Sequence, residues 1–174
     1  MRAAAPRGAL VLILALCLSG CSLLARRAPT AAPAPAAAAA TPAAAATGDA
    51  IATSAAALIG TRYEFGGADA GGFDCSGLAL YVYERAGISI PRTAAEQQRA
   101  ALPVPRGQLM PGDLVFFRMR SRRIDHVGIY LGNDRFVHAP HRGVAVSSAD
   151  LSSGFYARHL VNAGRFPAAP VSSP

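Results

Sequence analysis

Hydrophobic positions recur at helical spacing in the middle of the chain and alternate with polar ones in its second half. The clearest helical pattern covers residues 74–86, where apolar residues share one face and a glycine follows as a stop. Asp74 stands at the cap position of this helix, where a carboxylate accepts backbone N–H groups of the first turn. Further helices are expected over residues 49–60, capped by Asp49, and over 93–100, opened by a capping box.

After Pro111-Gly112 the pattern changes to the alternation that is typical of strands with one buried face. A Gly-Asn-Asp turn signal at 132–134 separates two of these strands. Helices followed by hairpin-connected strands indicate an α+β fold, here with N-terminal helices packed on an antiparallel β-sheet. The strands are expected at residues 114–119, 126–131, 135–139, 144–147 and 159–165.

Composition excludes several kinds of chemistry. All 17 basic residues are Arg, so neither Schiff-base catalysis nor a phosphate-loop lysine is available. The net charge is +7, but the four Arg within residues 1–48 account for much of it and leave 13 Arg against 10 acidic residues. Basic repeats with interleaved aromatic residues are absent from the sequence. Nucleic acid is therefore not expected as a partner.

Residues 1–20 have the form of a removable export signal. Arg2 and Arg7 precede ten consecutive apolar residues, which are too few to span a bilayer as a stable helix. The segment ends in Leu-Ser-Gly before Cys21 and resembles a bacterial lipobox. This resemblance implies cleavage before Cys21 and lipidation of that residue. The alternative is an ordinary secretory signal with an incidental cysteine.

Residues 21–48 are expected to form a tether behind the lipidated Cys21. Positions 22–48 hold 14 Ala and 4 Pro without apolar periodicity, so they cannot bury a core. Such a segment reaches from about 30 Å as a coil to about 80 Å in a polyproline-like form. Residues 49–174 remain for one domain. We expect a lipid-anchored protein of the bacterial cell envelope, on the periplasmic face of the outer membrane because Ser22 replaces the Asp that retains lipoproteins at the inner membrane.

Cys75 would be the one cysteine with a free thiol in the mature chain. Cys17 leaves with the signal and Cys21 takes the lipid, so Cys75 has no partner for an intramolecular disulfide. Such a thiol is either a small buried hydrophobe or a reactive group. Cys75 follows the cap residue Asp74, and at a helix start the backbone N–H groups and the helix dipole favour the thiolate. We therefore expect the pKa of Cys75 to be lowered.

His126 and His138 are expected to face each other across a hairpin. The turn at 132–134 lies midway between them, and their even spacing places both on the same face as near cross-strand partners. A cysteine with two histidines fits a nucleophile, a base and a residue that orients the base. Cysteine and histidine are also zinc ligands, and His141 lies nearby, although no spacing typical of zinc proteins is present.

Several segments occur in an order and at spacings that are specific to one family. They are Arg62-Tyr63-Glu64-Phe65-Gly66-Gly67, Gly72-Phe73-Asp74-Cys75-Ser76-Gly77-Leu78, Pro111-Gly112-Asp113-Leu114-Val115-Phe116-Phe117, His126-Val127-Gly128-Ile129-Tyr130-Leu131-Gly132 and Val137-His138-Ala139. From about residue 50 to 166 the chain resembles the NlpC-type cell-wall cysteine peptidases, which have a papain-like fold.

The resemblance implies a role for each matching residue. Cys75 would be the nucleophile, His126 the base and His138 the residue that orients the base. The hydroxyl of Tyr63 would help the backbone N–H of Cys75 to stabilise the oxyanion. The two residues that flank the nucleophile, Asp74 and Ser76, would cap the helix and bind the amino-terminal side of the substrate.

The function implied is that of a lipid-anchored cysteine endopeptidase, which hydrolyses amide bonds in peptidoglycan stem peptides through an acyl-enzyme. It would need no cofactor and would act as a monomer. An amidase or acyltransferase with the same machinery, a zinc protein and a non-catalytic cell-wall-binding lipoprotein are the alternatives. The resemblance covers enzymes that cleave different bonds of the stem peptide and does not select among them.

Other polar residues have plainer interpretations. Asp113 precedes an expected strand and is expected to be a turn residue. His141 is expected in a surface loop. Arginines cluster within residues 118–123, either as a solvated hairpin tip or as a patch that attracts the carboxylates of an anionic cell-wall polymer.

Overall fold

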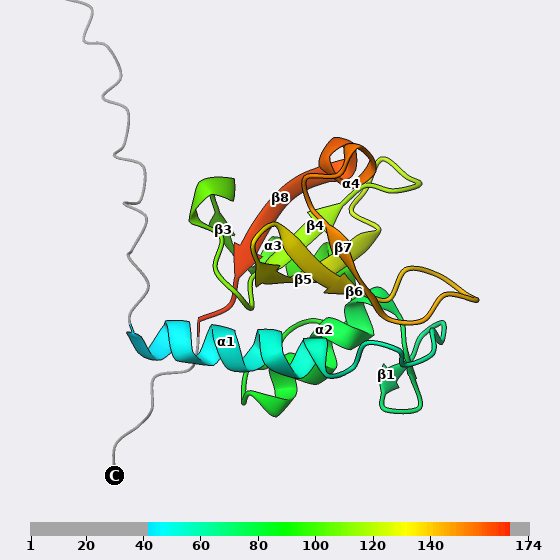
Figure 1. The fold of residues 1–174 in the computed structure, drawn as a ribbon, viewed down its shortest axis with the longest axis horizontal. Helices are drawn as coiled ribbons and strands as arrows, with labels where there is room; N and C mark the ends of the chain where they lie inside the picture. The colour runs from blue at the N-terminus through cyan, green and yellow to red at the C-terminus, as the bar shows by residue number, and fades with distance from the viewer. Residues whose placement is uncertain (1–41, 168–174) are drawn as a thin grey trace, which may run out of the picture. The chain divides into compact units, whose positions relative to one another are not determined.

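The computed structural model describes residues 42–167 of the chain, and Figure 1 shows their fold. The expected export signal at 1–20, the expected lipidation site Cys21 and the first part of the expected tether lie outside the described residues. Helices and an antiparallel sheet build the described part, so the α+β prediction is confirmed. No helix within this part is long and apolar enough to cross a membrane.

The largest sheet has six strands in the order β3-β8-β4-β5-β6-β7, and each neighbouring pair is antiparallel. A short hairpin of β1 and β2 stands apart from it. The helices are α1 (Pro42–Ala56), α2 (Cys75–Arg85), α3 (Ala94–Ala100), the 3-10 helix η1 (Arg106–Gln108) and α4 (Gly154–His159). The strands are β1 (Ala68–Asp69), β2 (Gly72–Phe73), β3 (Leu102–Val104), β4 (Leu114–Phe117), β5 (His126–Gly132), β6 (Arg135–His138), β7 (Ser147–Asp150) and β8 (Leu160–Arg165).

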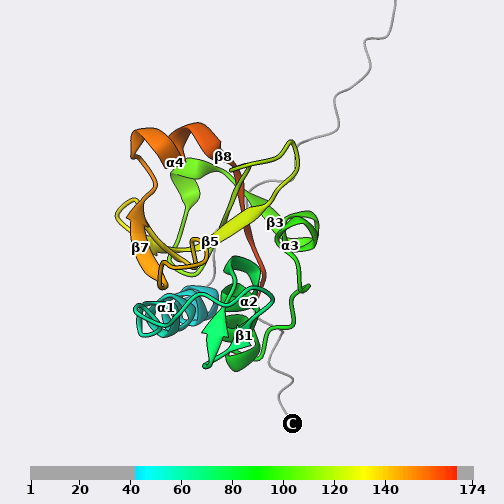
Figure 2. The same ribbon diagram turned by 90° about the vertical axis from the view of Figure 1, so that its right-hand side faces the viewer.

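Alternate residues of the strands pack on opposite faces of the sheet, as strand geometry requires. One face carries mainly aliphatic residues such as Val127 and Ile129, which pack with the buried sides of α1 and α2. Both helices lie on this side in Figures 1 and 2. The other face carries aromatic residues, among them Phe117 and Phe136, and α4 contributes Tyr156 to it. The helix that holds Cys75 and the strand that begins with His126 therefore belong to adjoining layers.

The first helix begins earlier than the sequence predicts. It starts at Pro42 rather than with Asp49 as its cap, and it ends at Ala56 rather than near residue 60. Proline is well suited to the first turn of a helix, because its missing N–H has no partner there in any case. Ile51 and Ala55 are buried against the sheet, and they are the contacts that hold α1 in place.

The end of the chain also differs from expectation. Strand β7 covers Ser147–Asp150 rather than residues 144–147, and His159 ends the unpredicted helix α4 rather than starting β8. The reason for the shift is that Val146 pairs with the loop after α1: its N–H donates to the Thr61 carbonyl at 2.8 Å, and its carbonyl accepts from Gly60 at 2.9 Å. The pairing of β7 with β6 therefore begins only at Ser147.

Candidate active site

The position of Cys75, the first residue of α2, depends on the cap before it. The Asp74 carboxylate accepts the backbone N–H of Gly77 at 2.7 Å, as the sequence predicts for a cap. A side chain at Gly77 would overlap the carbonyl of Gly67, so this glycine lets the preceding loop lie directly against the helix start. The backbone N–H of Asp74 donates to the same carbonyl at 3.0 Å. Loop and helix together fix the direction of the Cys75 side chain.

A charged network surrounds this cap. Arg92 donates to both carboxylate oxygens of Asp74, from Nη2 at 2.6 Å and from Nη1 at 3.1 Å. The same Nη1 donates to the Ser76 hydroxyl at 3.0 Å, and this hydroxyl donates to Asp74 at 3.1 Å. Burial acts to raise the pKa of Asp74, but the hydrogen bonds from Arg92 and Gly77 together hold it below its ordinary value. The carboxylate is therefore ionised and paired.

The network confirms the capping role that was expected of Asp74. Asp74 and Ser76 are not among the described residues that line the large cavity beside Cys75, so their expected contact with substrate stays a prediction. Arg92 was not predicted from the sequence. It lies 18 positions after its partner, and no local pattern indicates that the chain returns to the cap at this point.

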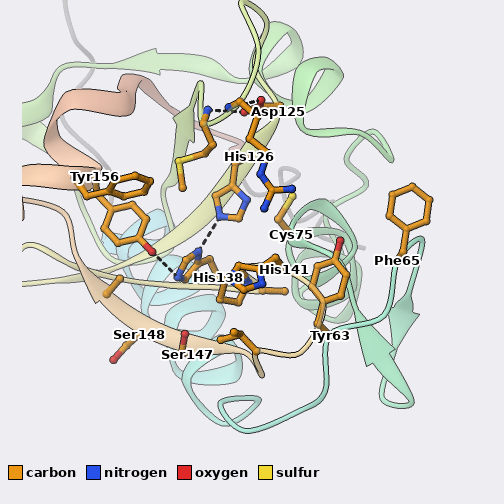
Figure 3. Close-up of a pocket in the computed structure, with 17 residues that line it drawn as sticks. Tyr63, Phe65, Cys75, Asp125, His126, His138, His141, Ser147, Ser148 and Tyr156 are labelled. Carbon is orange, nitrogen blue, oxygen red and sulfur yellow. Dashed lines mark hydrogen bonds between the residues drawn. The ribbon is translucent and has the colours of Figure 1, made fainter.

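His126 and His138 lie at the same end of the sheet. His126 is the first residue of β5 and His138 the last of β6, and the two strands run antiparallel. The pairing of Ile129 with Val137 sets His138 across from position 128, so it lies diagonally opposite His126 on the same face, as expected. His126 Nε2 is 2.8 Å from His138 Nδ1, a contact that Figure 3 marks, and the planes of the two rings are nearly perpendicular, at 88°.

Aromatic rings hold both imidazoles in place. The Phe117 ring centroid is 6.0 Å from that of His126, and the Phe136 centroid is 5.0 Å from that of His138. A side chain at Gly128 would overlap the Phe136 ring, so the glycine of the His-Val-Gly motif makes room for this packing. Both histidines are buried. Their orientation is therefore fixed by packing as well as by the hydrogen bond between them.

The helix start and the strand end meet at the Cys75 thiol. The backbone N–H of Val127, the residue after His126, acts on the thiol and lowers its pKa. Figure 3 shows Cys75 beside the His126 ring, with His138 on the other side of that ring. A cavity of about 600 Å³ opens at this point and is lined by Cys75, His126, His138 and Tyr63, together with residues of β7 and α4. The structure thus brings together the nucleophile, base and orienting residue that the sequence nominates.

Burial makes the charged forms of both central groups unfavourable. It raises the pKa of the Cys75 thiol to about 11, against the lowering effect of the Val127 and Ser76 N–H groups. It also lowers the pKa of His126 to about 4, although Asp125 acts in the opposite direction. The expectation that the helix start lowers the thiol pKa is therefore wrong. The rise in the thiol pKa caused by desolvation is larger than the lowering caused by the N–H groups at the helix start. The degree of burial cannot be seen in the sequence.

The two pKa shifts together favour a neutral resting site. A thiolate on Cys75 and an imidazolium on His126 would each lose hydration at the cavity wall, and burial shifts both pKa values against these charged forms. We therefore infer that the resting site holds a neutral thiol and a neutral imidazole.

His138 has a further partner on its far side. The Tyr156 hydroxyl lies 3.3 Å from His138 Nε2, and both residues line the cavity. Burial lowers the pKa of His138 to about 3, and the charges on His126 and His141 act in the same direction. His138 is therefore also neutral. Sequence analysis missed Tyr156, which lies in a Ser- and Gly-rich segment without a helical pattern.

Tyr63 and two arginines lie at the rim of the cavity. Burial raises the pKa of Tyr63, and the nearby charges of Cys75 and Asp74 act in the same direction. Arg120 and Arg142 act in the opposite direction on the pKa of this hydroxyl. Arg120 lines the large cavity and, with Arg142, Tyr63, exposed Phe65 and His141, a smaller hollow of about 330 Å³ beside it. Tyr63 thus lines the same cavity as Cys75, and its oxyanion role stays a prediction.

Two aspartates hold the loops around the sheet. Asp125 accepts the backbone N–H groups of Met119, Arg120 and Ser121 at 2.7–2.9 Å, which orders the arginine-rich hairpin tip. Asp113 is the expected turn residue and accepts the Met110 N–H at 2.8 Å. It is also buried and forms an ion pair with a β8 arginine, which the sequence did not indicate.

The zinc alternative lacks a suitable cluster in the part of the chain that the structure describes. Within residues 42–167 no three side chains of His, Cys, Asp or Glu come together in a group that could hold a metal ion. His141 is exposed in its loop, as expected, and its Nδ1 contacts the Arg142 carbonyl at 2.9 Å.

The α+β fold, with a cysteine at a helix start and two histidines at the adjoining end of an antiparallel sheet, is that of a papain-like domain. The model of the NlpC/P60 family matches residues 60–165. The chain belongs to this family.

Known relatives support this assignment. The chain is 46% identical over 112 residues to murein DD-endopeptidase MepH of Escherichia coli K12, a match that covers 62% of this chain and 41% of that protein. It is 43% identical over 109 residues to bifunctional muramidase/DL-endopeptidase CwlT of Bacillus subtilis 168, covering 61% and 32%. The crystal structure of an NlpC/P60 family protein from Bacillus cereus ATCC 10987 matches with a TM-score of 0.65 at 30% identity, covering 69% and 40%. The chain spans less than half the length of each of these proteins.

Proposed function

We propose that this chain is a cysteine endopeptidase that hydrolyses amide bonds in the stem peptides of peptidoglycan. The observation that carries the proposal is the meeting of Cys75 with the His126–His138 pair at the wall of a cavity large enough for a peptide. Two relatives of the chain are named as endopeptidases, one of them acting on murein. The resemblance and the geometry thus assign the same residues to the chemistry.

The first step forms an acyl-enzyme. The Cys75 thiol transfers its proton to His126 Nδ1 while its sulfur bonds to the carbonyl carbon of the substrate amide, so neither charge exists alone in the buried site. The carbonyl oxygen becomes an oxyanion, which accepts from the Cys75 backbone N–H and the Tyr63 hydroxyl. The C–N bond then breaks, and His126 gives the proton to the leaving amine. A thioester on Cys75 remains.

The second step releases the acyl group. A water molecule gives a proton to His126 as its oxygen bonds to the thioester carbon. The C–S bond breaks, a carboxylic acid leaves, and His126 returns the proton to Cys75. In both steps His126 passes through the imidazolium form, in which its Nε2–H donates to His138 Nδ1 along the observed 2.8 Å contact. His138 stabilises and orients this form.

The rim of the cavity suits an anionic substrate. Arg120 and Arg142 line one hollow with Tyr63, both are exposed, and no carboxylate is among the described residues that line this hollow. Stem peptides carry free carboxylates, which this rim attracts. Arg120 is the member of the arginine cluster that lines the cavity. For Arg120 we therefore favour the role of attracting substrate carboxylates over that of a solvated hairpin tip.

A lipid on Cys21 would hold the domain at the periplasmic face of the outer membrane. Support comes from the lipobox-like sequence and the Ala- and Pro-rich segment after it. Cys21→Ala should move the protein from the membrane to the soluble fraction and leave hydrolysis of isolated peptidoglycan unchanged. Continued membrane binding of this variant would contradict the anchor. All residues of the proposed machinery come from one chain, so we expect a monomer to be active.

Digestion of purified peptidoglycan, followed by mass spectrometry of the released fragments, tests the proposed function. The wild-type protein should release stem-peptide fragments whose masses identify the bond, since the names of the relatives include both DD- and DL-endopeptidases. Cys75→Ala should release none while its thermal unfolding stays close to that of the wild type, because alanine suits a helix. Equal release by both proteins would contradict the proposal.

A further inference from the structure

We propose that Tyr156 is a positioning residue of this site. Its hydroxyl oxygen accepts a hydrogen bond from His138 Nε2–H and thereby keeps His126 in the tautomer that can take the proton of Cys75. The inference rests on the proposed function for its consequences in catalysis. Its structural part concerns the location of two hydrogen atoms and can be measured without substrate.

The position of the Tyr156 hydroxyl is set by packing. Its ring stands edge-on to Phe136 at a centroid distance of 5.0 Å and to Phe117 at 5.8 Å. It also meets the His138 ring edge-on at 5.4 Å, with the hydroxyl 3.3 Å from Nε2. Figure 3 shows a continuous series of contacts from His126 through His138 to Tyr156. The aromatic neighbours of His126 and His138 thus also hold the last member of the series.

The hydrogen bonds of this series must all point the same way. His126 can accept the thiol proton on Nδ1 only if its own hydrogen lies on Nε2. That hydrogen then donates to His138 Nδ1 across 2.8 Å, so His138 must carry its hydrogen on Nε2. The partner of Nε2–H is the Tyr156 oxygen. The hydroxyl hydrogen of Tyr156 is left to donate into the cavity that it lines.

The reverse direction would disable the base. If the Tyr156 O–H donated to His138 Nε2, the His138 hydrogen would lie on Nδ1 and donate to His126 Nε2. His126 would then carry its hydrogen on Nδ1, facing Cys75. Once His126 is protonated, moreover, two N–H groups would face each other in a buried site. Proton transfer therefore requires Tyr156 to be the acceptor.

Replacement of the hydroxyl should weaken the base without removing it. In Tyr156→Phe the Nε2–H of His138 loses its acceptor at a buried position, which favours the reverse tautomers and disfavours the imidazolium of His126. We expect kcat to fall about three- to tenfold with KM unchanged. Because the imidazolium is less stable, the pKa of His126 falls, and the acidic limb of the pH–rate profile moves to lower pH.

The matched control removes a hydroxyl from the same aromatic cluster. Tyr130 lies in that cluster, and its hydroxyl accepts the Asp134 backbone N–H at 3.1 Å rather than contacting a histidine. Tyr130→Phe should change thermal stability at most and leave the pH–rate profile in place. An equal shift of the profile in both variants would mean that the effect is structural, and it would overturn the assignment.

Nitrogen NMR of the imidazoles separates this inference from the proposed function. In the wild-type protein at neutral pH, His126 and His138 should both carry their hydrogen on Nε2, whether or not any substrate is found. In Tyr156→Phe a fraction of both should shift to Nδ1–H. A wild-type His138 with its hydrogen on Nδ1 would overturn the inference even if Tyr156→Phe fails to fold. Absence of hydrolysis by the wild type would instead refute the proposed function. The NMR measurement of the His126 and His138 tautomers would still test the role of Tyr156.

Discussion

Two polar networks meet at Cys75, and they differ in charge. On the helix side, Asp74 and Arg92 form an ion pair at 2.6 Å that reaches Ser76 on the other flank of the cysteine. On the sheet side, His126 and His138 are buried, and the pKa of each is lowered to about 4 and about 3. The helix side is thus ionised at neutral pH, and the sheet side is neutral.

The difference shows how the fold separates support from proton transfer. The ion pair between Asp74 and Arg92 stabilises the first turn of α2, and this turn directs the Cys75 thiol. A neutral imidazole can accept a proton, whereas an imidazolium formed in advance could not. With Arg92 paired to the cap and aromatic rings packed against both histidines, the chain keeps its base neutral next to an ion pair.

The largest effect should follow from loss of the sheet-side base. His126→Ala should lower kcat at least roughly a thousandfold, nearly as much as Cys75→Ala, because members of such a unit act together. Steady-state hydrolysis of purified stem peptides measures this. Retention of more than a tenth of the wild-type kcat would show that His126 is not the base.

His138→Asn should cost less, about tenfold, since an amide oxygen can still accept from His126 Nε2–H and hold the ring. His138→Leu is the matched comparison, because it has similar volume but offers no acceptor. Equal losses in the two variants would contradict the orienting role.

On the helix side, Asp74→Asn tests the ionised cap. The folded pKa of Asp74 is depressed, so its charge stabilises the fold above about pH 4, and this contribution is lost as the pH falls through the folded pKa. Because the Arg92 side chain is 38% exposed, solvent screens the pair, and we expect a loss of about 1 kcal/mol at pH 7. The difference in urea midpoint from the wild type should shrink toward zero in acid.

Asp69→Asn is the control for this measurement. The Asp69 carboxylate lies in the neighbouring loop and accepts the Gly71 N–H. The substitution removes this carboxylate and leaves the charge of the cap residue Asp74 in place. If the difference in urea midpoint between the wild type and Asp74→Asn stays constant from pH 7 into acid, the charge of Asp74 does not stabilise the fold and only its shape matters.

The smallest effect should come from the rim. Arg120→Gln should raise KM about threefold with kcat nearly unchanged, and the difference should fade as salt increases. Arg122→Gln, from the same hairpin tip, should leave KM unchanged. If both variants behave alike, the rim attracts substrate through net charge rather than through a defined position.

Much of the site could be predicted from the sequence because its signals are local. Cys75 follows its cap by one residue, and His126 and His138 flank one hairpin, so the cap residue and the turn signal were enough to predict where these residues lie. Arg92 and Tyr156 act through partners 18 residues away, and no local pattern encodes those contacts. The pKa of Cys75 was predicted in the wrong direction because the helix start is visible in the sequence and the burial is not.

The fold shows the same limit. The alternation after Pro111 predicted β4, β5 and β6 within two residues at each end. The strand expected at 144–147 was misplaced because Val146 pairs with the loop at Gly60 and Thr61, which precedes it by more than eighty positions. Pairing with a distant segment, rather than local propensity, decided where β7 begins.

The neutral resting site is the central claim, and the pH dependence of Cys75 alkylation tests it most directly. The purified mature protein would be treated with iodoacetamide from pH 5 to pH 10, and mass spectrometry of the Cys75 peptide would give the rate at each pH. We expect the rate to rise with a midpoint above that of a free thiol, about 8.5, because burial raises the thiol pKa. A rate that has already reached its plateau below pH 7 would show a preformed thiolate and contradict the account.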